Sequence, residues 1–214
     1  MTTVNVIDET GLSASDFATL ITAIKHFTPL VTKAWSLPDV SIVTGKAPAT
    51  GEWVIYITER NRVNGATGFH TFQNGVPVAF CSPKAAYRLF GHYSKPLIVK
   101  GKQLRAAQYT EGLITTICHE LAEMLCDPQI STLSTQDKNG HTWLVEVCDH
   151  CFGSYTNFVV GSTACILPDV TTPSFYNLKG TAPFSILGAA TAPFTMTPKG
   201  YGYYRDAKGK LIKL

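Results

Sequence analysis

The segment from Thr110 to Cys126 constrains the fold most, because its apolar and polar residues separate onto two faces of one helix. Asp127 and Pro128 end the helix, since proline cannot continue it. Apolar residues that recur at helical spacing form one face: Leu113, Ile114, Ile117, Leu121 and Leu125. Polar residues share another face: Thr116, His119, Glu120, Glu123 and Asp127. The sequence therefore predicts a helix that is buried along one side.

The first sixty residues predict alternating strand and helix. Residues 4–7 form a short strand, and Ser13 or Ser15 caps a helix that ends before Pro29 or soon after it. Residues 40–43 and 53–58 are rich in β-branched and aromatic side chains and predict two strands.

A hairpin follows. Residues 69–72 and 76–80 flank the pair Asn74-Gly75, and Asn-Gly is the strongest short signal for a hairpin turn. Pro77 predicts an edge position for the second strand, since proline lacks a backbone donor. The order of elements indicates an α+β fold in which a mixed sheet packs on the helix at 110–126.

The chain changes character after Pro168, where prolines interrupt short apolar runs. Its aromatic residues are too numerous for a disordered tail. We expect a core over residues 1–168 and an irregular, ordered extension over residues 169–214 that packs on the core.

Composition narrows the functional classes. The net charge of +3 comes from scattered basic residues, which argues against a nucleic-acid partner. The N-terminus does not resemble a secretory signal, and no segment is long and apolar enough for a membrane span. The redox state of the six cysteines stays open.

His119-Glu120-Leu121-Ala122-Glu123 places two metal-type ligands on one face of the helix, because residues four apart lie above one another. Glu120, one position round, can reach a water molecule. A catalytic zinc commonly has three protein ligands, and Glu146 is the preferred third. Asp149 can accept the second imidazole hydrogen of His119 and so fix its orientation. Asp149, His150, His141 and Asp127 remain alternatives as third ligand.

These residues carry a resemblance. His119-Glu120-x-x-Glu123 followed by Glu146-x-x-Asp149 resembles a gluzincin-type zincin in which glutamate replaces the second histidine. The stretches at residues 118–128, 145–149 and 187–201 resemble a group of phage and bacterial proteins. The resemblance implies a zinc-dependent metallopeptidase of phage or prophage type, with Glu120 as general base for metal-activated water that attacks a peptide carbonyl. It also implies a location in a host cytoplasm or a phage virion.

Other interpretations stay open. One imidazole and two carboxylates also suit manganese or iron. Low charge and an aromatic extension also fit a virion or assembly protein that binds other virion subunits and retains only a structural metal. The third alternative is a helix face that carries surface charges and binds no metal.

Cys148 and Cys151 form a CxxC that fits buried thiols better than a structural zinc. Four side chains are candidates to stabilise an oxyanion: Tyr155, Tyr176, His70 and His150.

Overall fold

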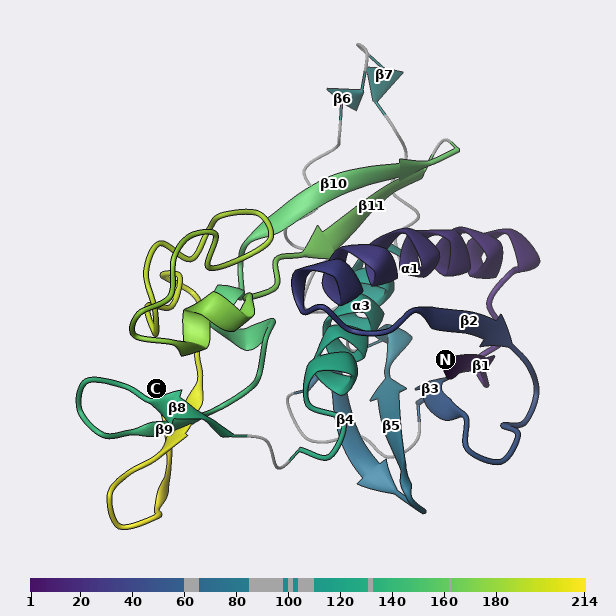
Figure 1. Ribbon diagram of the computed structural model, residues 1–214. Coiled ribbons are helices and arrows are strands. Elements are labelled where there is room, and N and C mark those ends of the chain that lie inside the picture. The colour runs from purple at the N-terminus through teal and green to yellow at the C-terminus, as the bar shows by residue number, and fades with distance from the viewer. Residues whose placement is uncertain (60–65, 85–97, 100–101, 104–109, 131–132, 162) are drawn as a thin grey trace.

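The computed structural model describes residues 1–59, 66–84, 98–99, 102–103, 110–130, 133–161 and 163–214 (Figure 1). Its largest sheet has the order β2-β1-β3-β5-β4, and β4 is the one strand in it that pairs antiparallel with its neighbour. The prediction of an α+β fold with a mixed sheet is confirmed. The five strands are β1 (Thr2–Asp8), β2 (Val40–Thr44), β3 (Trp53–Ile57), β4 (Gly68–Gln73) and β5 (Val76–Cys81).

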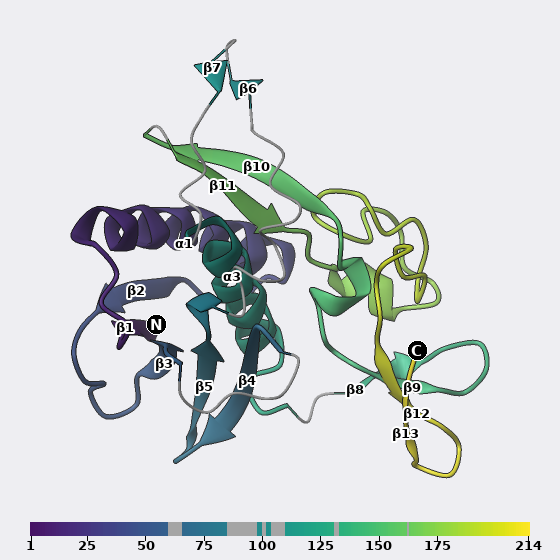
Figure 2. The ribbon, with the colours of Figure 1, turned by 180° about the vertical axis from the view of Figure 1, so that it is seen from behind.

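Two helices of the described ranges, α1 (Ala14–Ala34) and α3 (Thr110–Cys126), pack on one face of this sheet and against each other. The predicted apolar face of α3 is fully buried from Leu113 to Leu121. It shares one core with sheet residues such as Val6 and Ile55. Because α3 also contacts β4 and β5, its polar face lies near the edge of the sheet (Figures 1 and 2).

The helix α1 is longer than its proline suggested. Ser13 caps it by accepting a hydrogen bond from the backbone N–H of Asp16, as the sequence predicted. The helix then continues through Pro29 to Ala34. Val31 and Thr32 lie beyond the proline and are buried, so packing of the last turns outweighs the lost backbone hydrogen bond.

The prediction that Pro77 marks an edge strand is wrong. Strand β5, which contains Pro77, lies between β3 and β4, and β4 forms the edge. Pairing of β5 with β3 begins at Val78, one residue after the proline. Pro77 therefore stands where β3 requires no donor from it.

The second half of the chain forms smaller sheets around this core. The hairpin of β10 (Tyr155–Val160) and β11 (Thr163–Pro168) packs on α1 and α3, on the side away from the large sheet (Figure 1). A four-stranded sheet has the order β13-β12-β9-β8. Its strands are β8 (Leu133–Gln136), β9 (Thr142–Leu144), β12 (Tyr203–Arg205) and β13 (Leu211–Lys213), and a separate pair is β6 (Ile98–Val99) with β7 (Lys102–Gln103).

Residues 169–214 contain long irregular stretches and two anchoring strands. A 3₁₀ helix, η2 (Pro173–Tyr176), buries Phe175 and Tyr176, and the Trp35 indole donates a hydrogen bond to the Thr171 carbonyl at 2.7 Å. Strand β12 pairs with β9, which ties the extension to residues before it in the chain. Within the described ranges, no helix has the length and apolar character that a membrane crossing requires.

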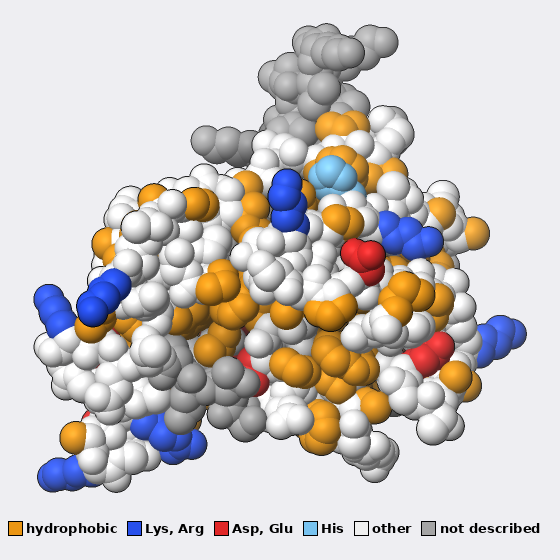
Figure 3. Space-filling model, in the orientation of Figure 1, with side chains coloured by type: hydrophobic (Ala, Val, Ile, Leu, Met, Phe, Trp, Pro, Cys, Tyr) orange, Lys and Arg blue, Asp and Glu red, His pale blue; other side chains and the backbone are white. Residues whose placement is uncertain are grey.

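Figure 3 shows Lys and Arg side chains on separate parts of one face, with hydrophobic side chains exposed between them. This surface agrees with the low share of charged residues, 15% of the sequence. In the described part of the chain, ionisable side chains cluster in a cavity beside α3.

Candidate metal centre

One cavity of about 360 Å³ lies between α3, the edge strand β4 and the segment that follows β9. The five residues singled out from the sequence all line it: His119, Glu120, Glu123, Glu146 and Asp149. His70 of β4 joins them, and Tyr201 and Tyr203 from the C-terminal extension form another side. The sequence motif therefore faces a hollow, and not open solvent.

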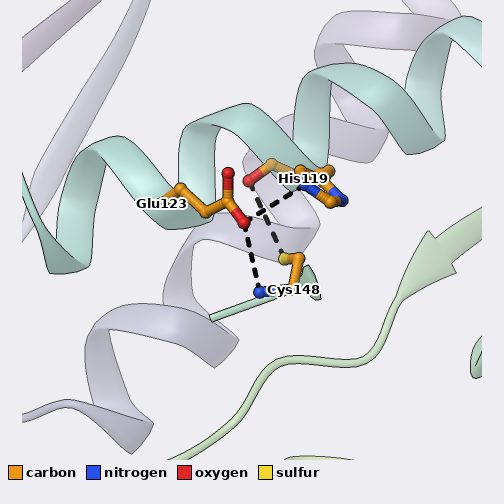
Figure 4. Close-up of side chains that lie close together, drawn as sticks. All are labelled: His119, Glu123 and Cys148. Atoms are coloured by element: carbon orange, nitrogen blue, oxygen red, sulfur yellow. Dashed lines mark hydrogen bonds and ion pairs between the residues drawn. The ribbon is translucent and has the colours of Figure 1, made fainter. Parts of the chain in front are cut away.

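His119 and Glu123 meet on the polar face of α3, as four-residue spacing requires. The Nε2 atom of His119 lies 3.1 Å from Oε1 of Glu123. The backbone N–H of Cys148 donates to the same carboxylate oxygen at 3.4 Å. The Cys148 thiol donates to the His119 carbonyl, with 3.7 Å between sulfur and oxygen (Figure 4). The segment after β9 is thus fixed directly against the motif helix.

His70 enters the cavity from the edge strand. Its Nδ1 atom lies 3.3 Å from Oε2 of Glu120 and 3.4 Å from Oε2 of Glu123. This approach depends on Gly68, where an added Cβ would stand 2.7 Å from the Thr116 methyl carbon and 2.8 Å from Oε1 of Glu120. A residue without a side chain lets β4 run close enough to α3 for His70 to reach both glutamates.

Asp149 approaches His119 at a different atom from the one expected. It begins the 3₁₀ helix η1 (Asp149–Cys151), and its Oδ1 lies 3.1 Å from Nε2 of His119, the nitrogen that also faces Glu123. This oxygen is buried, and His119 is the partner that it faces. The Tyr201 hydroxyl is hydrogen-bonded to the Asp149 carboxylate. Asp149 therefore lies beside the His119 nitrogen to which a cation would bind.

The donor atoms fit a divalent cation. Two sets each have ligand atoms within 4.8 Å of one another: His119 with Glu123 and Cys148, and His70 with Glu123 and Glu146. Bonds of about 2.0–2.2 Å to zinc place tetrahedral ligands roughly 3.3–3.6 Å apart. The separations of 3.1 Å and 3.4 Å between Glu123 and the two imidazoles are close to that spacing. The described residues therefore include groups that can hold a metal ion.

The electrostatics of the metal-free cavity are those of crowded carboxylates. Burial raises the pKa of Glu146 to about 9, and the charge of Glu123 adds to this effect. Burial likewise raises the pKa of Glu120 and of Asp149. Burial alone would lower the pKa of His70, but Glu120 and Glu123 outweigh it and raise that pKa to about 11. Without a metal, protons must supply the positive charge that these groups require.

The remaining candidates for a metal ligand or an oxyanion donor lie outside this cavity. His141 faces Asp137, with 3.1 Å between Nδ1 and Oδ2, and does not line the cavity. His150 is completely buried among aromatic residues, and its Nδ1 is 3.0 Å from the Tyr176 hydroxyl. Tyr176 points to this interior group, and neither Tyr155 nor Asp127 lines the cavity. Tyr201 instead presents a hydroxyl to the cavity, and nothing in its spacing had distinguished it from the other tail tyrosines.

Comparisons with family models, with curated proteins and with solved structures found no match to this chain. The functional argument therefore depends on the residues of the cavity.

Proposed function

We propose that the protein is a zinc-dependent metallohydrolase, of the zincin-like type, that cleaves peptide bonds. One observation carries the proposal: the polar face of α3 places His119, Glu120 and Glu123 in one cavity, where further His, Glu and Asp side chains converge from other elements. A mixed sheet packed on the helix that carries the motif supports the zincin-like assignment.

His119 and Glu123 would hold the zinc, and Glu146 or Asp149 would complete its protein ligands. A bound divalent cation supplies the charge that acidifies a water molecule and polarises a carbonyl group. Oxygen donors from two carboxylates also suit manganese or iron, which makes these ions alternatives to zinc. The sulfur of Cys148 lies in the same cluster and would favour zinc if it bound the ion as a thiolate.

Glu120 has the position of a general base. Its carboxylate lines the cavity but is one residue round from the His119–Glu123 pair, so it can hold a proton without occupying a ligand position. Burial raises its pKa, which brings its proton affinity closer to that needed near neutral pH. In hydrolysis, the water oxygen bonds to the carbonyl carbon while Glu120 takes the water proton. The carbon–nitrogen bond then breaks and Glu120 returns the proton to the leaving amine.

Tyr201 supplies a donor at the opposite side of the cavity. Its hydroxyl is hydrogen-bonded to Asp149 and borders both this cavity and an adjoining one of about 280 Å³. A hydroxyl in this place can orient Asp149 and can donate to negative charge that develops on a substrate oxygen. The two adjoining cavities also share Gly68, His119 and Glu120, so a chain longer than one residue can extend past the proposed base.

Glu120→Gln tests this function, because the amide keeps the shape of the side chain and cannot accept the proton. We expect the rate of cleavage of a mixed peptide library to fall roughly 10²–10⁴-fold. Zinc content, measured by elemental analysis, should stay the same. Glu52→Gln is the control, since Glu52 lies between β2 and β3 and bonds to Asn5, away from the cavity.

The same experiment separates the enzyme from an assembly protein with a structural metal. A wild-type chain that binds zinc, gains thermal stability from it and cleaves no peptide would contradict the hydrolase and favour the assembly protein. Equal cleavage by wild type and Glu120→Gln would remove Glu120 from the mechanism.

A further inference from the structure

We propose that the cavity holds two divalent cations, with Glu123 as the carboxylate that bridges them. One ion lies between His119, Glu123 and Asp149, and the second lies between His70, Glu123 and Glu146. The inference rests on the proposed metal centre and adds to it a second ion, whose ligands come from β4 and from the segment after β9.

The two oxygens of Glu123 face different partners. Oε1 is 3.1 Å from Nε2 of His119, whereas Oε2 is 3.4 Å from Nδ1 of His70. Glu123 is also the residue common to both sets of clustered ligand atoms. Centres with two metal ions place them about 3.5–4 Å apart, a span that the two oxygens of one carboxylate bridge. Each oxygen of Glu123 therefore has an imidazole of its own.

The charge of the lining also calls for two ions. Four carboxylates line the cavity, together with two imidazoles that are neutral as ligands: Glu120, Glu123, Glu146 and Asp149, with His70 and His119. No Lys or Arg lines this cavity within the described ranges. One divalent cation would balance two of these carboxylates and leave the other two to be neutralised by protons, because a buried unpaired charge is costly. Two divalent cations balance all four carboxylates.

A separate observation concerns Asp149. Only 6% of this residue is exposed. Its Oδ1 is directed at the cavity, and the partner that it faces there is Nε2 of His119, at 3.1 Å. An Nε2 atom that binds a cation has no hydrogen to donate, so this buried carboxylate oxygen would then need the cation as its partner. Asp149 therefore completes the first ion, which leaves Glu146 for the second.

The test is the number of ions that the folded chain binds. Protein stripped with a chelator is reloaded with zinc, freed of excess metal and analysed for zinc per chain. We expect two for the wild type, one for His70→Ala, one for His119→Ala and two for the control His26→Ala, whose imidazole is exposed on α1 and stacks on Phe158. Circular dichroism checks that each variant is folded, and His70→Asn replaces His70→Ala if the latter is not.

A second measurement distinguishes a bridged pair from two unrelated ions. Wild-type protein loaded with manganese should give the electron paramagnetic resonance spectrum of two exchange-coupled ions, and both histidine variants should give that of isolated ions. One zinc in the wild type, kept in His70→Ala and lost in His119→Ala, would overturn the second ion but leave the proposed function intact. Two ions retained in His70→Ala, or two uncoupled ions in the wild type, would also overturn the bridged pair. No bound ion at all would overturn both proposals.

Discussion

Two regions of the molecule enclose a histidine and affect its pKa in opposite ways. In the acidic cavity beside α3, neighbouring glutamates raise the pKa of His70 to about 11. In the aromatic cluster, burial lowers the pKa of His150 to about 4. That cluster consists of Trp143, His150, Phe175, Tyr176 and Phe194. Burial alone therefore does not decide the charge of a histidine; the charge of its neighbours does.

The two regions meet at two adjacent residues. Asp149 lines the acidic cavity, and His150, which follows it in η1, is enclosed by the aromatic cluster. The C-terminal extension binds to both sides of this junction, since the Tyr201 N–H donates to the Asp149 carbonyl at 3.0 Å. The aromatic cluster has well-packed, largely neutral contacts that support the fold. The acidic cavity has crowded carboxylates and imidazoles that could hold a metal ion, and this difference is the basis of the proposed function.

Two glycines give the sharpest test of the difference. An added Cβ at Gly202 would stand 2.7 Å from Nε2 of His150, whose ring has no space to move, so we expect Gly202→Ala to lower the free energy of unfolding by about 2–3 kcal/mol. An added Cβ at Gly68 would press on Thr116 and Glu120 and move β4 away from α3. We expect Gly68→Ala to weaken zinc binding roughly 10–100-fold. Urea unfolding and zinc titration measure the two effects.

Gly45→Ala is the control for both, because its added Cβ would meet the end of the Asn5 side chain, at 3.1 Å, and the Ala47 carbonyl oxygen at an ordinary contact distance of 3.5 Å. Folded Gly202→Ala protein should retain normal zinc affinity. If Gly68→Ala changed stability and left zinc binding intact, the close approach of β4 would serve packing alone.

In the metal-free protein, the two histidines should change the free energy of unfolding in opposite directions as the pH rises. His150 has a lower pKa folded, about 4, than unfolded, about 6.5, so the unfolded chain binds more protons between these values. Its stabilising contribution is complete above pH 6.5 and is lost as the pH falls toward 4. His70 has a higher pKa folded, about 11, so its contribution is complete below pH 6.5 and is lost as the pH rises toward 11.

Replacing each histidine by a residue that does not titrate in this pH range isolates its contribution to the free energy of unfolding. Between pH 6.5 and 4.5, wild type should lose about 2 kcal/mol more of its free energy of unfolding than His150→Phe does. Between pH 7 and 9, it should lose about 2 kcal/mol more than His70→Gln does. Urea unfolding at each pH gives these differences. Parallel curves for wild type and His70→Gln would mean that His70 is neutral in the metal-free cavity.

The sequence predicted the parts of this arrangement that depend on local spacing. The helical repeat from Leu113 to Leu125 specified which side of α3 packs in the hydrophobic core, and Asn74-Gly75 specified the hairpin of β4 and β5. His70 could not be linked to Glu120 in this way, because fifty residues separate them and a sheet edge brings them together. Tyr201 enters the cavity through the packing of an irregular segment, for which no periodic pattern exists. The errors at Pro29 and Pro77 have one cause, since tertiary context determined whether a missing backbone donor mattered.

Cys148 lies at the boundary between the two regions and should produce the smallest effect. Its sulfur belongs to a cluster of possible metal ligands, but its thiol donates to the His119 carbonyl and burial raises its pKa well above the usual range. Both features favour a protonated thiol that positions α3 over a thiolate that binds zinc. We therefore expect Cys148→Ala to cost about 1 kcal/mol of stability and to change zinc affinity by no more than about ten-fold.

Cobalt substitution decides between these roles of Cys148, because a thiolate ligand produces a charge-transfer absorption in the near ultraviolet and a protonated thiol does not. The cobalt-loaded wild type should lack that band, and Cys148→Ala should leave its spectrum unchanged. A band that disappears in Cys148→Ala would move Cys148 into the ligand set. A thiolate would also add a negative charge to the ligands of the ion held by His119. It would strengthen the case for zinc there, since sulfur ligands favour zinc over manganese.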